Sequence, residues 1–460
     1  MIKIIKENYD NDLMEIFRAF NVPLNDFDYH IELFSNSCNI TIIYGKIYNT
    51  LYKLLSDMPD LIIKRQIKRY LKRDLYRILS EFYNKKLPYG SLTGVRPTKL
   101  FYDLLSENQD AYKVLIEEFD VSSNKVELIT NIIKSQEGIY NTEKEKIDLF
   151  INIPFCPSRC SYCSFLSADI NKTKNFVFEY TDYLLTDIDK ALLLIKDKNY
   201  SIRSVYIGGG TPTALPTELF IKVIDKVRFL APEITVEAGR PDSITILKLK
   251  IMKDAGVTRI SVNPQSFNDK TLEIIGRNHS VDAVYSVFNE ARKIGFDINM
   301  DIIAMLPEES LSDFINTVNK TIELNPDNIT VHTLSLKRGS KLKNEEFNNL
   351  SEQKLAEDMI NYAYQHLKMN AYEPYYMYRQ KYMSGNLENV GYSRLGKQCI
   401  YNIDIMEETH SVIACGAGAI SKIIINDRIE RAANVKDIKN YIDRFEEIMS
   451  RRSDIFNNKF

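Results

Sequence analysis

From residue 147 to about 334 the chain alternates between short apolar runs and amphipathic runs, and this alternation is the feature that most restricts its fold. The apolar runs predict six strands, at 148–153, 204–207, 234–238, 258–262, 297–303 and 328–334. The runs between them carry apolar residues at helical spacing and predict helices at 178–195, 218–230, 244–255, 281–294 and 311–324. Strands that alternate with helices form parallel sheets with the helices outside. Six repeats are fewer than a complete eight-fold barrel has, so we predict an α/β fold with a partial (β/α)6 TIM-like barrel.

Two regions of different character flank the barrel segment, which we place at 146–340. Residues 1–145 predict a separate α+β extension, with short strands at 31–34 and 39–44 and an amphipathic helix at 60–84. A charged run, EKEK, marks its end.

The C-terminal region, 341–460, is expected to be mostly helical and to cover the substrate. Helices are predicted near 346–369 and 434–452. Between them lie a segment rich in Tyr, Gly and Asn at 373–396 and a glycine-rich, strand-like stretch at 411–425.

The charge balance argues against a nucleic-acid-binding protein. The chain has 60 Lys and Arg against 62 Asp and Glu, a formal net charge of −2, whereas generic nucleic-acid binders are clearly basic. One exception is local, because the outer face of the helix at 60–84 carries seven basic residues between 64 and 77. Such a face could bind a polyanion, but a solvated helix surface is the more common explanation.

The sequence predicts a cytoplasmic protein without a membrane segment. No apolar run approaches the ~20 residues that a membrane span needs, and the first residues become polar too early for a signal peptide. In a reducing compartment we expect the six cysteines to be thiols or metal ligands.

Three of these cysteines lie close together, directly after the first predicted strand. Residues 153–163 read IPFCPSRCSYC, so Cys156, Cys160 and Cys163 have the spacing C-x3-C-x2-C. Three thiolates at this spacing suit an iron–sulfur cluster or zinc. On a [4Fe–4S] cluster they leave one iron without a protein ligand, as catalysis requires. A structural metal site would have no need of such an open position.

Polar and glycine residues follow the later predicted strands, where the active sites of barrel enzymes lie. The second strand ends in three consecutive glycines, 208–210, which let the backbone approach a ligand closely. Glu237 ends the third strand and Asp301 lies on the fifth. A buried carboxylate needs partners, so each could face a ribose or an amino group or be satisfied within the core. Their placement at successive strand ends favours a binding site.

The cysteine loop after a first barrel strand resembles the radical S-adenosylmethionine (SAM) enzymes. In that superfamily SAM binds the open iron of a [4Fe–4S] cluster, and its reductive cleavage gives a 5′-deoxyadenosyl radical that abstracts hydrogen from the substrate. Over roughly 147–340 the chain is similar to the oxygen-independent coproporphyrinogen III oxidase (dehydrogenase) family. The motifs at 92–98, 378–381 and 385–392 resemble the HemZ-type coproporphyrinogen dehydrogenase branch, which has an N-terminal extension like residues 1–145.

This resemblance implies a role for individual residues. Cys156, Cys160 and Cys163 would bind the cluster, and Tyr162 would pack against SAM. Further residues implied in SAM binding are Phe155, Gly209, Gly210, Thr211, Glu237, Gln265, Arg277 and Asp301.

The implied reaction is the oxidative decarboxylation of two propionates of coproporphyrinogen III to vinyl groups, which gives protoporphyrinogen IX in anaerobic heme biosynthesis. The implied partners are this small molecule and a one-electron donor such as flavodoxin or ferredoxin. The substrate has four carboxylates, so basic side chains are expected near it. The candidates are Arg96, Arg240 and Arg379.

The chain departs from the family pattern at one place, and two other functions stay open. Family members have Tyr-x-His before Ile-Pro-Phe-Cys, where this chain has Phe150-Ile151-Asn152. One alternative is a heme-binding chaperone on the same scaffold, although the chain lacks any Trp and so lacks the His-Asn-x-x-Tyr-Trp motif of such chaperones. The other is a radical SAM methyltransferase that degrades heme.

Overall fold

The computed structural model describes residues 3–4, 9–22, 27–34, 36–54, 60–163, 168–335, 350–380, 386–425 and 428–457. The predicted helix start at 346–349 and the motif residues Lys381 and Gly385 lie outside these ranges. The chain divides into two compact units, Met1–Thr130 and Asn131–Phe460. Within the described ranges no helix combines the length and the apolar character needed to cross a bilayer.

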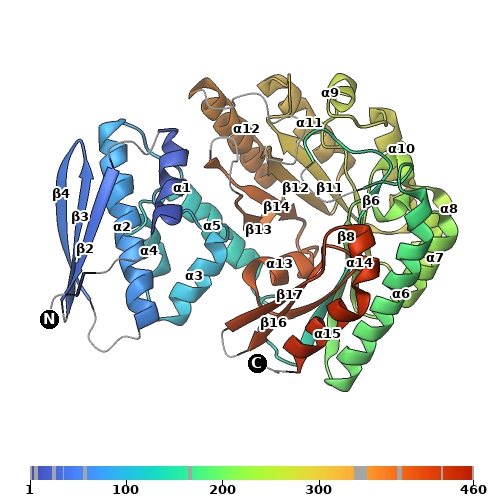
Figure 1. Cartoon of the computed structure of the whole chain (residues 1–460). Helices are drawn as coiled ribbons and strands as arrows, with labels where there is room; N and C mark the ends of the chain where they lie inside the picture. The colour runs from blue at the N-terminus through green and yellow to red at the C-terminus, as the bar shows by residue number, and fades with distance from the viewer. Residues whose placement is uncertain are drawn as a thin grey trace. The chain divides into compact units, whose positions relative to one another are not determined.

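The first unit contains an antiparallel four-stranded sheet and several helices (Figure 1). The sheet has the order β1-β2-β3-β4, and its strands are Lys3–Ile4, Phe27–Leu33, Ser37–Tyr44 and Lys46–Lys53. Its helices are α1 (Asp10–Phe20), α2 (Asp60–Phe82), α3 (Pro97–Ser106) and α4 (Ala111–Glu117), and α5 (Ser123–Ser135) contains the boundary with the second unit. Apolar residues of β2, β3, α1 and α2 form one core, so the predicted strands and the long helix are confirmed.

The basic face of α2 is largely paired inside the first unit. Arg69 and Arg77 form ion pairs with Glu118 and Asp120, at 3.4 and 2.9 Å. The guanidinium of Arg73 lies over the rings of Tyr52 and Tyr70. These side chains therefore stabilise the first unit. They make more contacts than the solvated helix surface that the sequence favoured.

The second unit is built on a curved sheet of eleven strands. Its six central strands are parallel neighbours in chain order: β5 (Lys146–Ile153), β8 (Ser201–Gly209), β9 (Glu233–Gly239), β10 (Arg259–Val262), β11 (Asp297–Ala304) and β12 (Asn328–Thr333). All six overlap the predicted strands. The partial (β/α)6 barrel is thus confirmed.

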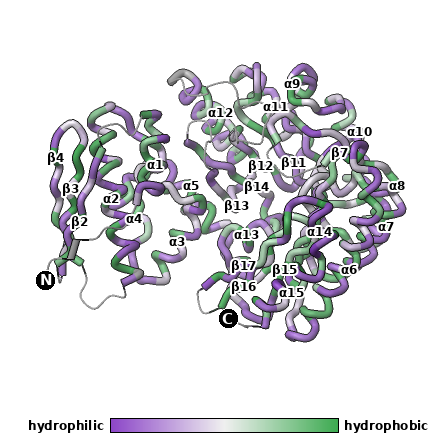
Figure 2. The backbone as a smooth tube through the Cα atoms, in the orientation of Figure 1, coloured by the Kyte–Doolittle hydropathy of each residue, from purple (hydrophilic) through white to green (hydrophobic). Residues whose placement is uncertain are grey.

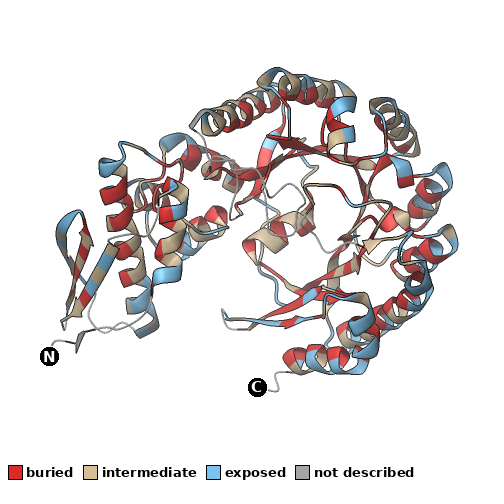
Figure 3. Cartoon of the chain, turned by 45° about the horizontal axis from the view of Figure 1, so that its top comes forward, coloured by how far each residue is buried: buried red, intermediate tan, exposed pale blue. Residues whose placement is uncertain are grey.

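Helices cover the outer face of these strands (Figures 1 and 3). They are α6 (Lys174–Asp197), α7 (Thr217–Lys226), α8 (Ile246–Asp254), α10 (Val281–Ile294) and α11 (Leu311–Leu324). Their inner faces join the apolar residues of the strands in one large core. Figure 2 shows hydrophilic and hydrophobic residues alternating along α6, as expected for a helix buried on one side. Local signals fix the helix ends, since Ser310 and Asp313 form a capping box at the start of α11 and Gly295 adopts a left-handed conformation after α10.

The C-terminal region contributes strands as well as helices, which the sequence only partly anticipated. Two strands extend the sheet beside β12 and three extend it beside β5: β13 (Glu373–Tyr378), β14 (Asn389–Ser393), β15 (Ser411–Cys415), β16 (Ile420–Ile425) and β17 (Arg428–Ala433). The helices are α12 (Leu350–Met369), α13 (Ile400–Glu407), α14 (Ile438–Asp443) and α15 (Phe445–Phe456). The helix predicted near 434–452 is present but divided in two, because Asp437 caps α14 and the backbone leaves the helical conformation at Arg444.

Two features join this region to the partial barrel. β15 pairs in parallel with β5, which places residues 411–415 beside residues 147–151. The buried guanidinium of Arg452 on α15 forms an ion pair with the buried carboxylate of Asp187 on α6. The last strands and helices are therefore part of the barrel itself.

Candidate active site

The three clustered cysteines lie in one loop that leaves the carboxyl end of β5. The short strand β6 (Phe155–Cys156) opens this loop and pairs with β7 (Ala168–Asp169). All three cysteines are free; Cys160 is buried, and Cys156 and Cys163 are partly exposed. The backbone N–H of Cys163 donates to the carbonyl of Cys160 at 3.2 Å, which turns the loop back on itself. Three thiols therefore stand at the carboxyl end of the first barrel strand.

The glycines after β8 pack against this loop backbone to backbone. The N–H of Gly210 donates to Ile153 at 2.8 Å, and that of Thr211 donates to Phe155 at 2.7 Å. A Cβ on Gly210 would stand 2.4 Å from the carbonyl oxygen of Phe155, and Gly209 has a φ of +108°. Only glycine fits so close an approach.

Arg277 and Tyr162 lie together against the cysteine loop. The buried guanidinium of Arg277 donates to the carbonyl of Asn263 at 2.6 Å. Burial opposes its charge, but the adjacent Tyr162 and Cys160 raise the pKa of Arg277 above its ordinary value. The structure thus brings Arg277 to the cysteines rather than to open solvent.

Arg240 also belongs to the cysteine loop, which differs from the role expected for it. It is 3% exposed, forms a two-point ion pair with Asp242, and donates to both oxygens of Ser158. Its guanidinium reaches to 4.0 Å from the sulfur of Cys160. These contacts leave it poorly placed to bind a substrate carboxylate, so we assign it to the support of this loop.

Glu237 and Tyr206 form a hydrogen-bonded pair inside the barrel. The Tyr206 hydroxyl on β8 donates to Oε1 of Glu237 on β9 at 2.6 Å. Burial raises the pKa of Glu237 to about 7, although the hydrogen bond from Tyr206 opposes this shift. The carboxyl group is therefore poised between its protonated and ionised forms near neutral pH.

Asp301 is held ionised by donors from its own strand and from the end of β10. The side-chain amides of Asn263 and Asn299 donate to its two oxygens at 2.7 and 2.8 Å. Burial would raise its pKa, but His332, Asn299 and Thr330 lower the pKa of Asp301 below its ordinary value.

Gln265 adopts a strained conformation beside Asp301. Its φ is +65°, and its N–H and C=O bond to Asp301 and Ile303 of β11 at 2.9 and 3.0 Å. Strain of this kind is retained mainly at functional sites. The buried amide oxygen Oε1 of Gln265 has no hydrogen-bond partner among the described residues, which suits a residue that waits for a ligand.

Sequence reasoning missed two residues of this interior, His332 and Tyr378. His332 Nε2 lies 3.7 Å from Oδ2 of Asp301, and its Nδ1 lies 3.3 Å from the hydroxyl of Tyr378 on β13. Burial raises the pKa of Tyr378, and the charges of Asp301 and Glu237 add to the shift. The only sequence signal for His332 was its position on the last predicted strand.

The other two arginines expected near the substrate lie in different compact units. Arg379, directly after β13, is buried and donates to the backbone and side-chain oxygens of Asn386. Arg96 precedes α3 in the first compact unit.

The positions that carry Tyr and His in the family serve packing in this chain. The ring of Phe150 stacks on Tyr401 of α13, with centroids 6.1 Å apart, and Tyr401 stacks in turn on Tyr206 at 4.4 Å. The side-chain amide of Asn152 donates to the carbonyl of Ala417 in the turn after β15. Neither residue replaces the missing hydroxyl or imidazole.

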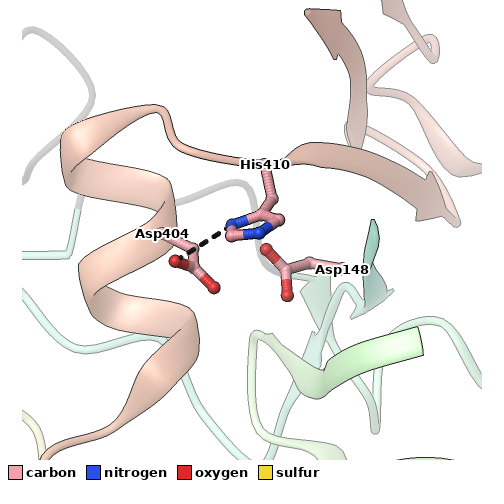
Figure 4. Close-up of side chains that lie close together, drawn as sticks. All are labelled: Asp148, Asp404 and His410. Carbon is pink, nitrogen blue, oxygen red and sulfur yellow. Dashed lines mark ion pairs between the residues drawn. The ribbon is translucent and has the colours of Figure 1, made fainter. Parts of the chain in front are cut away.

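A second group of titratable residues lies at the opposite end of β5. Figure 4 shows His410 between Asp404 and Asp148, and the ligand atoms of these three residues lie within 4.8 Å of one another, close enough to hold a metal ion. Arg203 already pairs with Asp404 at 2.6 Å, and the charge of the buried Lys422 acts on Asp148. Because Asp404 already has a cationic partner and burial raises the pKa of Asp148 well above its ordinary value, we assign this group a structural role in fixing α13 and β15 to β5.

The site residues fit the cofactors that the sequence suggests. Three free thiols share one loop, a glycine backbone lies against that loop, and an unpartnered amide oxygen at Gln265 and two carboxylates face the same interior. A [4Fe–4S] cluster needs such thiolates, and an adenosylmethionine offers amino and hydroxyl hydrogens for such acceptors.

Comparisons with known proteins agree with this arrangement. Residues 151–321 match the model of the Radical SAM superfamily. The chain is 36% identical over 407 residues to the oxygen-independent coproporphyrinogen-III oxidase-like protein HemZ of Bacillus subtilis, covering 85% of this chain and 81% of that protein. It is 29% identical over 303 residues to the heme chaperone HemW of Buchnera aphidicola, covering 65% of this chain and 76% of that one. Among solved structures it resembles the coproporphyrinogen III oxidase HemN of Escherichia coli, with a TM-score of 0.52, 21% identity and coverage of 67% and 71% of the two chains.

Proposed function

Because the chain belongs to the radical SAM family of oxygen-independent coproporphyrinogen III oxidase-like proteins, we propose that it oxidatively decarboxylates coproporphyrinogen III to protoporphyrinogen IX. The family uses a [4Fe–4S] cluster and SAM, which are the cofactors of this chain. The relationship to HemZ over most of both chains is the observation that carries the proposed reaction.

The proposed reaction removes two propionate carboxylates from the ring. When bound, the two cofactors supply hydrogen-atom abstraction from a carbon of the substrate. Each propionate then loses a β-hydrogen atom, CO2 and one electron, which passes to a one-electron acceptor, and a vinyl group remains. A donor such as flavodoxin or ferredoxin would supply the electron that starts each cycle.

Within this proposal the residues of the cysteine loop hold and shield the cluster. Cys156, Cys160 and Cys163 are its ligands, and Arg240 and Arg277 fix the loop from behind. Buried cations next to thiolates also offset the negative charge of the sulfur ligands.

The other strand ends bind SAM. Gly209, Gly210 and Thr211 offer backbone groups, Phe155 supports this backbone, and Tyr162 packs against the cofactor. Glu237, Gln265 and Asp301 accept hydrogen bonds from it. Contacts within the protein orient several of these groups before any ligand binds: Gly210 and Thr211 donate to the backbone of residues 153 and 155, Tyr206 donates to Glu237, and Asn299 donates to Asp301.

Anaerobic turnover tests the proposed reaction. Cluster-loaded, reduced protein is incubated with SAM and coproporphyrinogen III, and the products are oxidised and separated by chromatography. Protoporphyrin, together with one 5′-deoxyadenosine for each vinyl group, is the expected result. Cleavage of SAM without decarboxylation would assign the chain another substrate.

A heme chaperone is the second candidate, favoured by the similarity to HemW over 303 residues. It predicts stoichiometric heme binding by the unreduced protein and no decarboxylation. The absence of Trp from the chain argues against it, because the chaperone motif includes that residue.

A further inference from the structure

The segment that follows the strained residue Gln265 is tied to the first turns of α11. Each of residues 266–268 donates a hydrogen bond to a side chain of that region: Ser266 to Oε1 of Glu309, Phe267 through its N–H to Thr317 at 3.0 Å, and Asn268 to Asp313 at 3.3 Å. We call Glu309, Asp313 and Thr317 the α11 clamp. Three consecutive residues held in this way leave the chain after Gln265 little freedom to move.

The bond between Ser266 and Glu309 is the buried link of the clamp. Ser266 is completely buried, and Glu309 is 7% exposed. A buried hydroxyl hydrogen needs an acceptor, and the carboxyl group of Glu309 supplies it. The Ser266 oxygen in turn accepts the N–H of Asn268 at 3.2 Å. Loss of the Glu309 carboxyl group would therefore loosen the turn directly after Gln265.

Two strained loops meet at this bond. Gln265 has a φ of +65°, and in the loop that carries Glu309 the φ angles of Met305 and Glu308 are +68° and +60°. Such conformations persist only where the surrounding structure fixes them. On one side β11 fixes Gln265 through its N–H and C=O, and on the other side the α11 clamp fixes residues 266–268. The left-handed conformation of Gln265 therefore depends on both contacts.

We propose that Glu309 is a positioning residue of the SAM site: by holding Ser266 it keeps Gln265 in the conformation that presents its amide oxygen to SAM. This oxygen, Oε1, is buried and has no hydrogen-bond partner in the part of the chain that the structure describes. Glu309 acts through Ser266 and needs no contact with SAM. The inference rests on the proposed function, since Gln265 belongs to a SAM site only within that proposal.

The role of Glu309 requires an acceptor atom and not a charge. Burial raises the pKa of Glu309 to about 7, so the group is partly protonated near neutral pH. In either form a carboxyl oxygen can accept the hydrogen of Ser266. The side-chain oxygen of Gln can accept it as well, whereas Ala offers no acceptor. The conservative variant Glu309→Gln should therefore keep the function that Glu309→Ala loses.

Equilibrium dialysis of SAM against cluster-loaded, unreduced protein tests the clamp. If Glu309→Ala lowers the binding-competent conformation of Gln265 to about one tenth of the molecules, the Kd for SAM rises about tenfold. Ser266→Ala should raise the Kd by a similar factor, and the double variant should lose little more, because the two side chains form one bond. Glu309→Gln should stay within about threefold of the wild type.

Two controls separate positioning from a general loss of stability. Val284→Ala removes buried side-chain volume from the same barrel core on a different helix, α10. At a comparable fall in Tm it should leave the Kd for SAM within about twofold of the wild type. Glu323→Ala changes an exposed carboxylate of α11 itself and should alter neither the Tm nor the Kd.

The outcomes also separate this inference from the proposed function. Wild-type SAM affinity in Glu309→Ala and Ser266→Ala overturns the positioning role and leaves the proposed reaction standing. An equal loss of affinity in Val284→Ala, or no rescue in Glu309→Gln, overturns that role too. If the wild type binds SAM, the two Ala variants bind it weakly and coproporphyrinogen III stays unchanged on turnover, the positioning role stands and the proposed reaction is wrong. A wild-type chain that binds no SAM overturns both.

Discussion

The hydroxyl of Tyr206 donates a 2.6 Å hydrogen bond to the carboxyl group of Glu237 across two neighbouring barrel strands. Glu237 is nevertheless difficult to ionise, because burial raises its pKa from 4.5 to about 7. This pair links the stability of the barrel to pH at the centre of its candidate active site.

Replacement of Glu237 by Gln should make the barrel less sensitive to pH. Between pH 4.5 and 7 the folded protein keeps a proton that the unfolded chain has lost, so the free energy of unfolding falls as the pH rises through this window. Glu237→Gln removes this loss of stability. Relative to the wild type, the variant's Tm should therefore rise more at pH 8 than at pH 5, by roughly 1–3 °C. Thermal unfolding without SAM measures it, and Glu179→Gln on the exposed side of α6 is the control.

Cys160→Ala should abolish the visible absorption of the anaerobically reconstituted protein, because a thiolate ligand is lost. Cys38→Ala is the matched control, since Cys38 is a buried thiol in the core of the first unit. Iron and sulfide analysis gives an independent count. A Cys160→Ala protein that keeps a complete cluster would show that the ligand set is wrong.

Arg240→Gln should weaken the cluster site and not substrate binding. The change removes the bonds to Ser158 and leaves Asp242 without its ion pair. We expect the visible absorption to disappear severalfold faster in the presence of a chelator, with the KM for the substrate within about twofold of the wild type. Arg228→Gln removes an exposed ion pair and serves as the control. A large rise in KM at normal cluster stability would instead show that Arg240 binds the substrate.

Gly210→Ala should separate the glycine backbone from the cysteine loop. Its Cβ would stand 2.4 Å from the carbonyl oxygen of Phe155, a backbone atom that cannot move without the loop. Overpacking of this kind costs about 1–3 kcal/mol, and cluster incorporation should fall with it. At Gly94 the same methyl group meets only the side chain of Leu92 at 3.8 Å, so Gly94→Ala should be silent in both measurements. Normal SAM affinity in Gly210→Ala would show that this backbone does not bind SAM.

The central fold was predictable because each of its elements is encoded locally. The six strands and five helices of the barrel have apolar residues at the spacing of their own secondary structure. The strands beside this core were harder to recognise. Pro374 and Gly391 weaken β13 and β14 as sequence patterns, yet Gly391 is required there, since a Cβ would stand 1.8 Å from the ring of Tyr376.

The site residues also fall into two groups, those that the sequence revealed and those that only the fold brings together. The cysteines and the glycines were identified because each set is contiguous in the sequence. His332 and Tyr378 are 46 residues apart and meet only through the pairing of β12, β14 and β13. The hydrogen bond of Arg240 to Ser158, 82 residues away, could not be predicted from the sequence, where residue type alone suggested a substrate contact.

The pairing of β5 with β15 also bears on how the protein is made. The strand that leads into the cysteine loop acquires its second neighbour only when residues 411–415 have been synthesised, and Asp187 acquires its ion partner only at Arg452. During translation the growing chain therefore exposes one edge of a hydrophobic parallel sheet until residues 411–415 have been made. Contacts so distant in sequence slow folding and prolong the lifetime of aggregation-prone intermediates. Expression at reduced temperature or with chaperones should accordingly raise the yield of folded protein, and deletion of α15 should remove that benefit.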